Sequence, residues 1–549
     1  MTNSAQGQDG LLDYLPKIVT VWREGYGLTS LRADALAGLT VAIVALPLSM
    51  AIAIASGVGP ERGLYTAIVG GFLVSALGGS RYQVGGPAGA FIVLVSACVM
   101  ATGVQGLITA TFLSGLMLIV AGALRLGSYI RYIPYPVTVG FTAGIGVIIF
   151  ASQIKDLLGL SLPGAEPGEI LEKLATLWAA RGTVTAAAVG VALVTVAEIL
   201  ALRRWLPRWP GMLIAVAAAS ALVAGLGLPV ETIFTRFGAL PNLPPVPQLP
   251  ELGGAALRAA LPWAFSFALL GAIESLLSAV VADGMSGARH RSNAELLGQG
   301  VANIGSALFG GFCVTGTIAR TATNVRAGSH GPVSGMLHAL FVLAFMALAA
   351  PLAGYIPLAA LAAVLAVVAW GMVEKTEIAA LIRGSRGDAL IVGITFLLVV
   401  FRDLTSGILV GFALAGLVFI KRMSESIEVQ SMDDSPDPDQ TPGTGPLIYH
   451  LRGPVFFGSA VQIGGVLDRI ANRPRLLAID LTHVPMIDSS GARSFAVLAE
   501  KLHRKGGQLC LLGASGPVAA VLRGHGLGAP AALFLPDAAA LTALSADAA

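Results

Sequence analysis

Two charged side chains stand in parts of the sequence that otherwise hold little charge. Glu274 lies in the apolar stretch 259–283, and Arg320 lies early in the short stretch 317–328. An arginine inside a bilayer costs at least about 2.5–3.5 kcal/mol on insertion scales, so it is expected to face protein or a cavity. Arg320 could therefore add positive charge to an anion site, or it could form a permanent ion pair within the protein.

The lone carboxylate of Glu274 could couple transport to protons. A carboxylate in an apolar segment can bind a proton on one side of the membrane and release it on the other. Ser278 lies one turn later on the same face, so the two residues could instead hold sodium together with backbone carbonyls. Because Ile318 and Ala319 offer no side-chain oxygen to such a site, protons rank above sodium. A fixed Glu274–Arg320 ion pair is the structural alternative.

Two short segments resemble each other around a glycine. SRYQVGGPAGAF (80–91) and GFCVTGTIARTA (311–322) each open a short apolar stretch, and Gly86 corresponds to Gly316. A helix that begins in mid-membrane presents unpaired N–H groups and about half a positive charge at its N-terminus. Two such ends facing each other predict an anion site, because glycine leaves no side chain between the solute and the backbone. A packing seam of small residues is the alternative.

The composition indicates that these residues belong to a membrane protein. The chain has 549 residues, a mean hydropathy of +0.79, 55% hydrophobic residues and 12% charged residues, whereas soluble proteins carry about 25% charged residues. The net charge of +3 is too small for this length to suggest a nucleic-acid partner. Because no hydrolase triad, phosphate-binding loop or metal-ligand spacing stands out, we expect neither an enzyme nor a cofactor.

Breaks at glycine, proline and charged residues divide the apolar part into segments. The two glycine motifs open the third and the tenth segments and are therefore seven segments apart. Because seven is odd, the second copy is inverted in the membrane, as in transporters built from inverted repeats. We predict fourteen segments, near 35–56, 63–79, 86–100, 105–123, 135–154, 183–202, 210–227, 259–283, 295–311, 317–328, 332–350, 357–372, 388–401 and 404–420.

The distribution of lysine and arginine predicts the orientation. With the N-terminus in the cytoplasm, the loops on that side carry more than twice as many basic residues as the opposite loops, which favours a cytoplasmic location for both ends. Residues 1–33 are expected to form a cytoplasmic segment without a cleaved targeting peptide, and residues 34–422 a transport domain in the cell inner membrane.

The last part of the chain predicts a small soluble domain. Residues 423–446 are acidic and proline-rich and are interpreted as a linker, whereas residues 447–549 alternate strand and helix patterns. LIYHLRG, RLLAIDLTHV and QLCLLG predict strands, and SSGARSFAVLAEKLHRKG predicts an amphipathic helix that Asp488 could cap. Within the membrane part, Ser292-x-x-Glu295 predicts a capping box of structural importance.

Several long motifs resemble one known family. The segment from DALAGLTVAIVALPLSMAIAIASG to SRYQVGGPAGAF (34–91), GAIESLLSAVVADGMSG (271–287), SNAELLGQGVANIGSALFGGF (292–312) and ARTATNVRAG (319–328) resemble the SulP anion transporters, solute carrier family 26. DLTHVPMIDSSGARSF (480–495) is similar to the core of the STAS domain that this family carries.

The resemblance implies a fold and a site. It implies two inverted seven-segment repeats, in which a core domain (segments one to four and eight to eleven) moves in an elevator-like manner against a gate domain (five to seven and twelve to fourteen). The substrate would lie between segments three and ten. The residues expected to bind it are Leu48, Gly86, Ala88, Gly316, Thr317, Ile318, Ala319 and Arg320, with Glu274 and Ser278 as the proton-coupling residues.

The resemblance also implies a substrate. The motifs are most similar to the bacterial branch that carries C4-dicarboxylates, and the small side chain of Ala88 would leave room for four carbons. We therefore expect proton-coupled symport of succinate or fumarate. A bicarbonate or sulfate symporter, a passive anion channel and a scaffold that acts through its STAS domain are the alternatives.

The remaining expectations concern partners. The family forms homodimers, and its cytoplasmic STAS domain could recruit a protein partner. Ser490 corresponds to a serine that is phosphorylated in related bacterial anti-sigma-factor antagonists, and is therefore a possible phosphorylation site.

Overall fold

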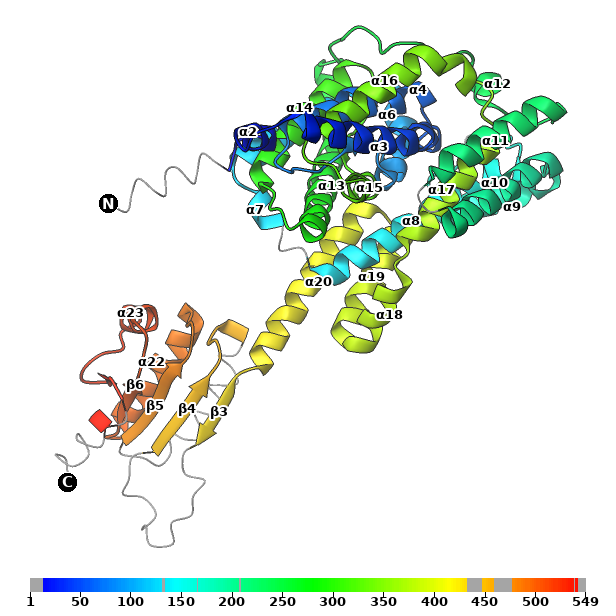
Figure 1. Cartoon of the computed structure of the whole chain (residues 1–549). Helices are drawn as coiled ribbons and strands as arrows, with labels where there is room; N and C mark the ends of the chain where they lie inside the picture. The colour runs from blue at the N-terminus through cyan, green and yellow to red at the C-terminus, as the bar shows by residue number, and fades with distance from the viewer. Residues whose placement is uncertain are drawn as a thin grey trace. The chain divides into compact units, whose positions relative to one another are not determined.

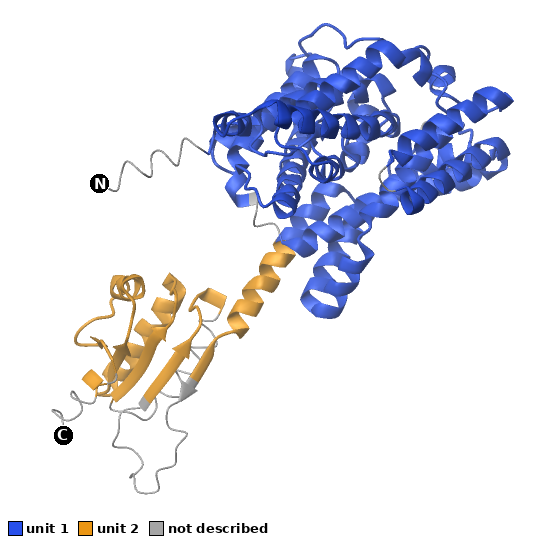
Figure 2. Cartoon of the chain, in the orientation of Figure 1, with its two compact units in different colours: residues 1–412 blue, residues 413–549 orange. Residues whose placement is uncertain are grey.

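The structure is a computed structural model that describes residues 13–130, 134–164, 166–206, 209–431, 447–458, 476–537 and 539–541. The chain divides into two compact units, residues 1–412 and residues 413–549 (Figure 2), and each is described here by itself.

The first unit is helical (Figure 1). Its first half consists of α2 (Lys17–Arg23), α3 (Leu28–Ala55), α4 (Pro60–Tyr65), the π-turn η1 (Thr66–Gly70), α5 (Gly71–Leu77), the 3₁₀ turn η2 (Gly89–Phe91), α6 (Ile92–Ala123), α7 (Gly127–Ile130), α8 (Tyr135–Leu158), α9 (Ile170–Ala179), η3 (Ala180–Thr183), α10 (Ala186–Trp205), α11 (Gly211–Leu226) and α12 (Ile233–Phe237).

The second half of the first unit is also helical. It consists of α13 (Gly254–Ser286), α14 (Ser292–Leu308), α15 (Ile318–Arg326), α16 (Val333–Ala353), α17 (Leu358–Met372), α18 (Lys375–Gly384), α19 (Arg386–Phe401) and α20 (Leu404–Glu425), which continues into the second unit. Two short strands, β1 (Gly85–Gly86) and β2 (Thr315–Gly316), precede η2 and α15.

The lengths of these helices suit a bilayer. In the described ranges, eight helices are long and apolar enough to cross a membrane, because about 20 residues span the hydrocarbon core. The protein is therefore a helical membrane protein with many apolar helices. Each of the fourteen predicted segments overlaps one of these helices or a shorter one, while the number of crossings stays a prediction.

The predicted boundary between the third and fourth segments coincides with a break. Gly103 has φ 71° and ψ −178° within α6, so the helix axis is interrupted there. A non-glycine residue rarely adopts this backbone conformation. The stretches 86–100 and 105–123 therefore belong to two helical parts that meet at Gly103.

The helices of the first unit contact one another in two groups. One group contains α3, α5, α6 and α13 to α16, and the other contains α8, α10, α11 and α17 to α19. Contacts between the groups run mainly through α3, which packs against α17 and α11. The first group contains the segments expected in the core, and the second contains those expected in the gate except the fourteenth, which is α20. The division into core and gate and their relative motion stay predictions.

The second unit contains a five-stranded sheet of order β3-β4-β5-β6-β7. The strands are β3 (Glu428–Ser431), β4 (Leu447–Arg452), β5 (Leu476–His483), β6 (Gln508–Leu512) and β7 (Ala532–Leu535), and the helices are α22 (Ser489–Arg504) and α23 (Gly516–Gly524). β3 is antiparallel to β4, whereas the other pairs are parallel.

The sequence predicted β4, β5, β6 and α22, and it missed β3, β7 and α23. The linker prediction was wrong at its start, because residues 423–425 continue α20 and Glu428–Ser431 pair with β4. A four-residue strand is too short for its alternation to stand out beside the acidic run. Residues 432–446 lie outside the described residues.

Candidate functional site

The two glycine motifs meet in the folded chain. Gly85 pairs with Gly316 and Gly86 with Thr315 in a short antiparallel ladder. The amide of Thr317 also donates to the carbonyl of Val84 (3.1 Å). Because η2 and α15 begin within three residues of this ladder, the unpaired N–H groups of two helix starts lie beside one crossing point.

A side chain at either glycine would displace a polar side chain, a constraint that the sequence did not show. A Cβ on Gly86 would stand 2.0 Å from Nη1 of Arg320. A Cβ on Gly316 would stand 1.7 Å from Nε2 of Gln83. Each glycine thus leaves room for a polar side chain that crosses the ladder, whereas the predicted reason was access for the solute.

Arg320 is buried, with a relative exposure of 2%, and lies against the first motif. Its Nη2 donates to the hydroxyl of Ser49 (3.0 Å) and to the carbonyl of Pro87 (3.3 Å). Nε and Nη1 have no hydrogen-bond partner within the described residues. Unsatisfied buried donors of this kind are costly, and an anion beside them would satisfy them. Ser49 was not among the residues that the sequence predicted for this site.

Glu274 and Arg320 do not form the fixed ion pair that was the structural alternative. Neither residue belongs to an ion pair of the described part of the chain. Oε2 of Glu274 is buried and has no hydrogen-bond partner there. A buried carboxylate without a partner is a group that can gain a proton at low structural cost.

Ser278 links α13 to α15 through a hydrogen bond. Its hydroxyl donates to Oγ1 of Thr321 (3.1 Å), which also accepts the amide of Val84 (3.2 Å). The hydroxyl of Ser278 is therefore engaged with α15, and no hydrogen bond of the described residues directs it to Glu274. This arrangement gives Ser278 a positioning role at the crossing.

A buried network behind the crossing was not predicted. Glu295 is fully buried, and its Oε2 accepts the amides of Gly79 (2.8 Å) and Ser80 (2.9 Å). Its Oε1 accepts Nε2 of Gln83 (2.7 Å) and the hydroxyl of Ser275 (3.0 Å). One carboxylate from α14 therefore holds the chain that leads into β1 and a side chain of α13.

The predicted capping box does not form. The residue before α14 is Arg291, and the start of α14 has no side-chain cap. The hydroxyl of Ser292 instead contacts Nε2 of His290 (3.0 Å). Glu295 turns inward because four donors from distant parts of the chain outweigh one local amide.

Two further polar residues of α14 hold the chain before β2. Gln299 donates Nε2 to the carbonyl of Val314. Nδ2 of Asn303 donates to the same carbonyl (3.0 Å), and Oδ1 of Asn303 accepts the backbone amide of Val314 (3.1 Å). Glu295, Gln299 and Asn303 follow at intervals of four residues, so a polar stripe on an apolar helix was the signal that could have revealed them.

The other residues predicted to bind the substrate differ in their exposure. Leu48, Ala88 and Thr317 are buried, Ile318 is half-buried, and Ala319 is exposed. Helices of the other group approach closely, because a Cβ on Gly89 would stand 3.1 Å from Cδ1 of Ile149 and 4.0 Å from Sδ of Met372. The site therefore lies at the boundary between the two helix groups.

Cavities open on the boundary at both sides of the site. One, of about 320 Å³, is lined by residues at the start of α6, among them Ile92 and Ala97, and by charged residues of both signs, namely Glu169, Glu172, Lys173, Arg402 and Asp403. The other, of about 310 Å³, is lined by α3, α10 and α11 and by Thr323 of α15. Solute could reach the crossing from either cavity if the groups shift.

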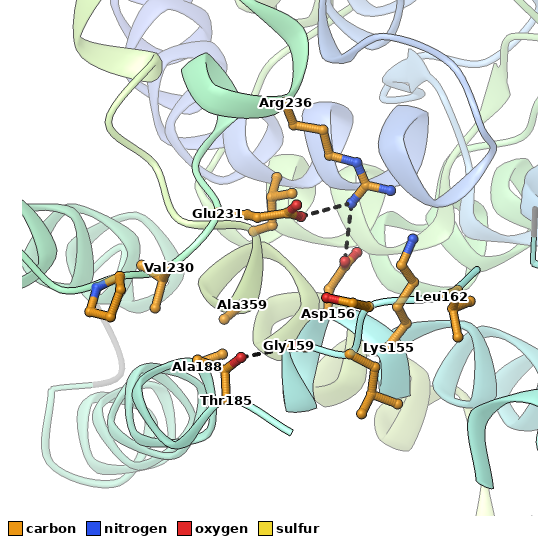
Figure 3. A pocket seen from close by; sticks show the side chains of 14 residues that line it. Lys155, Asp156, Gly159, Leu162, Thr185, Ala188, Val230, Glu231, Arg236 and Ala359 are labelled. Atoms are coloured by element: carbon orange, nitrogen blue, oxygen red, sulfur yellow. Dashed lines mark hydrogen bonds and ion pairs between the residues drawn. The ribbon is translucent and has the colours of Figure 1, made fainter. Parts of the chain in front are cut away.

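A third cavity is separate from the crossing. Figure 3 shows Arg236 between Asp156 and Glu231, to which its Nη1 lies at 3.1 and 3.7 Å. The described residues that line this cavity of about 320 Å³ include none from β1, β2 or α15. Its charges largely neutralise one another, so we do not assign the transport site to it.

Comparison with known sequences identifies the family. Residues 31–395 match the sulfate permease family, and residues 435–534 match the STAS domain. The chain belongs to the sulfate permease family. It is accordingly an anion transporter with a STAS domain, and its relatives are transporters rather than enzymes.

Individual relatives agree with this assignment. The chain is 39% identical over 499 residues to a putative sulfate transporter, YvdB, of Bacillus subtilis, which covers 89% of this chain and 93% of that protein. It is 30% identical over 509 residues to the bicarbonate transporter BicA of Picosynechococcus, which covers 89% of each.

A solved structure shares the fold. Murine solute carrier 26 family member A9, an anion transporter solved in the inward-facing state, superimposes with a TM-score of 0.85 at 19% identity, covering 100% of this chain and 95% of that chain. The resemblance to SulP and solute carrier family 26 transporters is thus confirmed, whereas the C4-dicarboxylate branch is not shown by these relatives.

In the STAS domain of this permease, the predicted cap is present. Oδ1 of Asp488 accepts the amide of Gly491 (2.8 Å), and Oδ2 accepts the amide of Phe457 (2.9 Å). Ser490 is exposed in the first turn of α22. A kinase could reach its hydroxyl, and the modification itself stays a prediction.

Proposed function

We propose that this permease is a secondary active transporter of a small inorganic oxyanion, with sulfate as the first candidate and bicarbonate as the second. The observation that carries the proposal is the ladder between Gly86 and Thr315, which sets two helix starts beside the partly unpaired guanidinium of Arg320. Helix N-termini and a guanidinium are established ways to hold an oxyanion.

The names of the relatives favour an inorganic oxyanion over a four-carbon substrate. The relatives named above carry the words sulfate and bicarbonate in their names. C4-dicarboxylates remain the competing candidate, since the small side chain of Ala88 supports them.

We assign coupling to Glu274. An anion that enters against a negative-inside potential needs compensation of about 2.3 kcal/mol per charge per 100 mV. Glu274 supports protons because its Oε2 lacks a partner among the described residues. Protons rank above sodium because Ile318 and Ala319 at the start of α15 offer no side-chain oxygen to a sodium site.

The movement that we propose uses the two helix groups. The group that holds both motifs shifts as a body against the group that contains α8 and α17, which exposes the crossing to either side in turn. We further propose cytoplasmic ends, a homodimer in the cell membrane, and a STAS domain that regulates transport through a protein partner or through modification of Ser490.

Uptake into proteoliposomes tests this function. With an inward proton gradient, labelled sulfate or bicarbonate should accumulate above its equilibrium level, and unlabelled sulfate should compete better than succinate or fumarate. A passive channel would only equilibrate the label. A chain that acts only as a STAS-based scaffold would show no uptake. Preferred uptake of succinate would show that the substrate is a dicarboxylate and not an inorganic oxyanion.

A further inference from the structure

One cavity at the boundary between the helix groups has an unusual charge. The cavity of about 310 Å³ is lined by Thr40 of α3, Arg203 of α10, Trp209 and Gly211 at the start of α11, and Thr323 of α15, together with apolar neighbours. Of the described residues around it, Arg203 alone is charged. The cavity therefore has a positive potential without a neighbouring carboxylate.

Arg203 is available to a solute. Its side chain is exposed, and it makes no ion pair or side-chain hydrogen bond within the described ranges. The first turn of α11, a helix of 16 residues, begins at Gly211 on the same wall and presents N–H groups without an intrahelical acceptor. The guanidinium and the helix start contribute charge of the same sign.

One face of α15 leads from the crossing to the cavity. Thr323 lines the cavity and lies one turn after Ala319, whose carbonyl accepts its hydroxyl (2.8 Å). Residues four apart share a helix face. Ala319 is exposed at the start of the helix, whereas its neighbour Arg320 is buried, so a solute at the cavity and one at the crossing would contact the same face of α15.

We infer that Arg203 forms an anion-recruitment subsite between one side of the membrane and the crossing. The ligand is the transported oxyanion itself, in a hydrated state before it reaches the helix ends. By the proposed orientation this side is the cytoplasm. The inference rests on the proposed function and adds a residue of the second helix group to the path.

The subsite has a kinetic consequence. A single cation in a narrow mouth raises the local anion concentration, and its effect is strongest at low ionic strength because the Debye length is about 10 Å at 0.1 M salt. The subsite therefore lowers the half-saturating concentration for anions that arrive from that side. It does not change the maximal rate, which the movement of the helix groups sets.

Arg204 provides a matched control. It is the next residue on α10 and is also exposed, but it does not line the cavity. The experiment compares Arg203→Gln and Arg204→Gln with the wild type in inside-out and right-side-out membrane vesicles, using labelled sulfate at low and high ionic strength. Arg203→Glu, which reverses the charge, is the second variant.

We expect Arg203→Gln to raise the half-saturating sulfate concentration about 3- to 10-fold in inside-out vesicles at low salt, and Arg203→Glu to raise it further. The maximal rate, the right-side-out value and Arg204→Gln should stay within about twofold of the wild type. An unchanged value for both Arg203 variants overturns the subsite, as does an equal effect of Arg204→Gln. Absence of any uptake by the wild type would instead overturn the proposed function.

Discussion

The backbone of Gly86 and the guanidinium of Arg320 occupy space that only a glycine leaves free: a Cβ at position 86 would stand 2.0 Å from Nη1. The two residues come from different halves of the chain, and the ladder between β1 and β2 brings them together. The proposed anion site thus depends on close packing of both halves.

Gly86→Ala tests this packing directly. Because Arg320 must move to admit a methyl group, the overpacking costs about 1–3 kcal/mol, and initial sulfate uptake should fall at least about tenfold at subsaturating sulfate. The control is Gly371→Ala on α17, where nothing lies within 4 Å of the added Cβ. Equal uptake by the Gly86 variant and the wild type would show that the guanidinium position does not matter.

Glu274→Gln separates coupling from binding. Glutamine keeps the shape of the side chain but cannot exchange a proton, so the variant should lose proton-driven accumulation while sulfate–sulfate exchange continues. Glu198→Gln is a matched control, because Oε2 of Glu198 on α10 is also buried without a partner in the described chain. If the Glu274 variant still accumulates sulfate in response to a proton gradient, another group couples transport to protons.

Glu295→Gln tests the network behind the crossing. An amide can accept at one oxygen only, so amides of Gly79 and Ser80 or the donors from Gln83 and Ser275 lose their partner. The expected loss of stability is about 1–3 kcal/mol, seen as a lower unfolding temperature of the purified protein.

Ser292→Ala is the comparison for that variant. Because Ser292 does not cap α14, its replacement should change stability by less than about 0.5 kcal/mol. If the serine variant were as destabilised as the Glu295 variant, the local capping box would be the correct description.

The STAS domain has a predicted pH dependence. Burial acts to raise the pKa of Asp480, but hydrogen bonds from the hydroxyl and amide of Thr482 and the contact with His450 hold that pKa below its usual range. A carboxylate with a lowered pKa stabilises the folded state above its unfolded pKa, about 3.9, and this contribution disappears as the pH falls through the folded value.

Calorimetry of the wild type and Asp480→Asn measures this contribution. At pH 7 the variant should unfold at a lower temperature in the transition of the C-terminal domain. The difference should persist at pH 5 and shrink below about pH 4. A difference that is independent of pH down to pH 3 would assign the effect to packing rather than to charge.

The local patterns of the chain predicted much of the fold. Hydrophobic segments, the break near Gly103 and the strands β4 to β6 follow from neighbouring residues, whose periodicity the sequence displays directly. β3 escaped detection because its only support is pairing with β4.

The site was predicted in part for the same reason. The correspondence of Gly86 and Gly316 located the crossing, since a repeated motif survives in the sequence. The amides of Gly79 and Ser80 that donate to Glu295, and the hydroxyl of Ser49 beside Arg320, lie more than 200 residues away from them. Residue type and local spacing therefore could not distinguish a capping glutamate from a buried network. Only the folded structure, which brings distant donors to Glu295, shows that this residue belongs to a buried network.

The central claim is that an oxyanion binds between the starts of η2 and α15. Selenate has the geometry of sulfate and scatters anomalously, so crystals grown with selenate at a concentration that inhibits sulfate uptake locate it directly. We expect an anomalous peak beside Ala88–Phe91 and Ile318–Arg320, and its loss in Gly86→Ala. A peak elsewhere, with none at the crossing, would show that the oxyanion binds at another place.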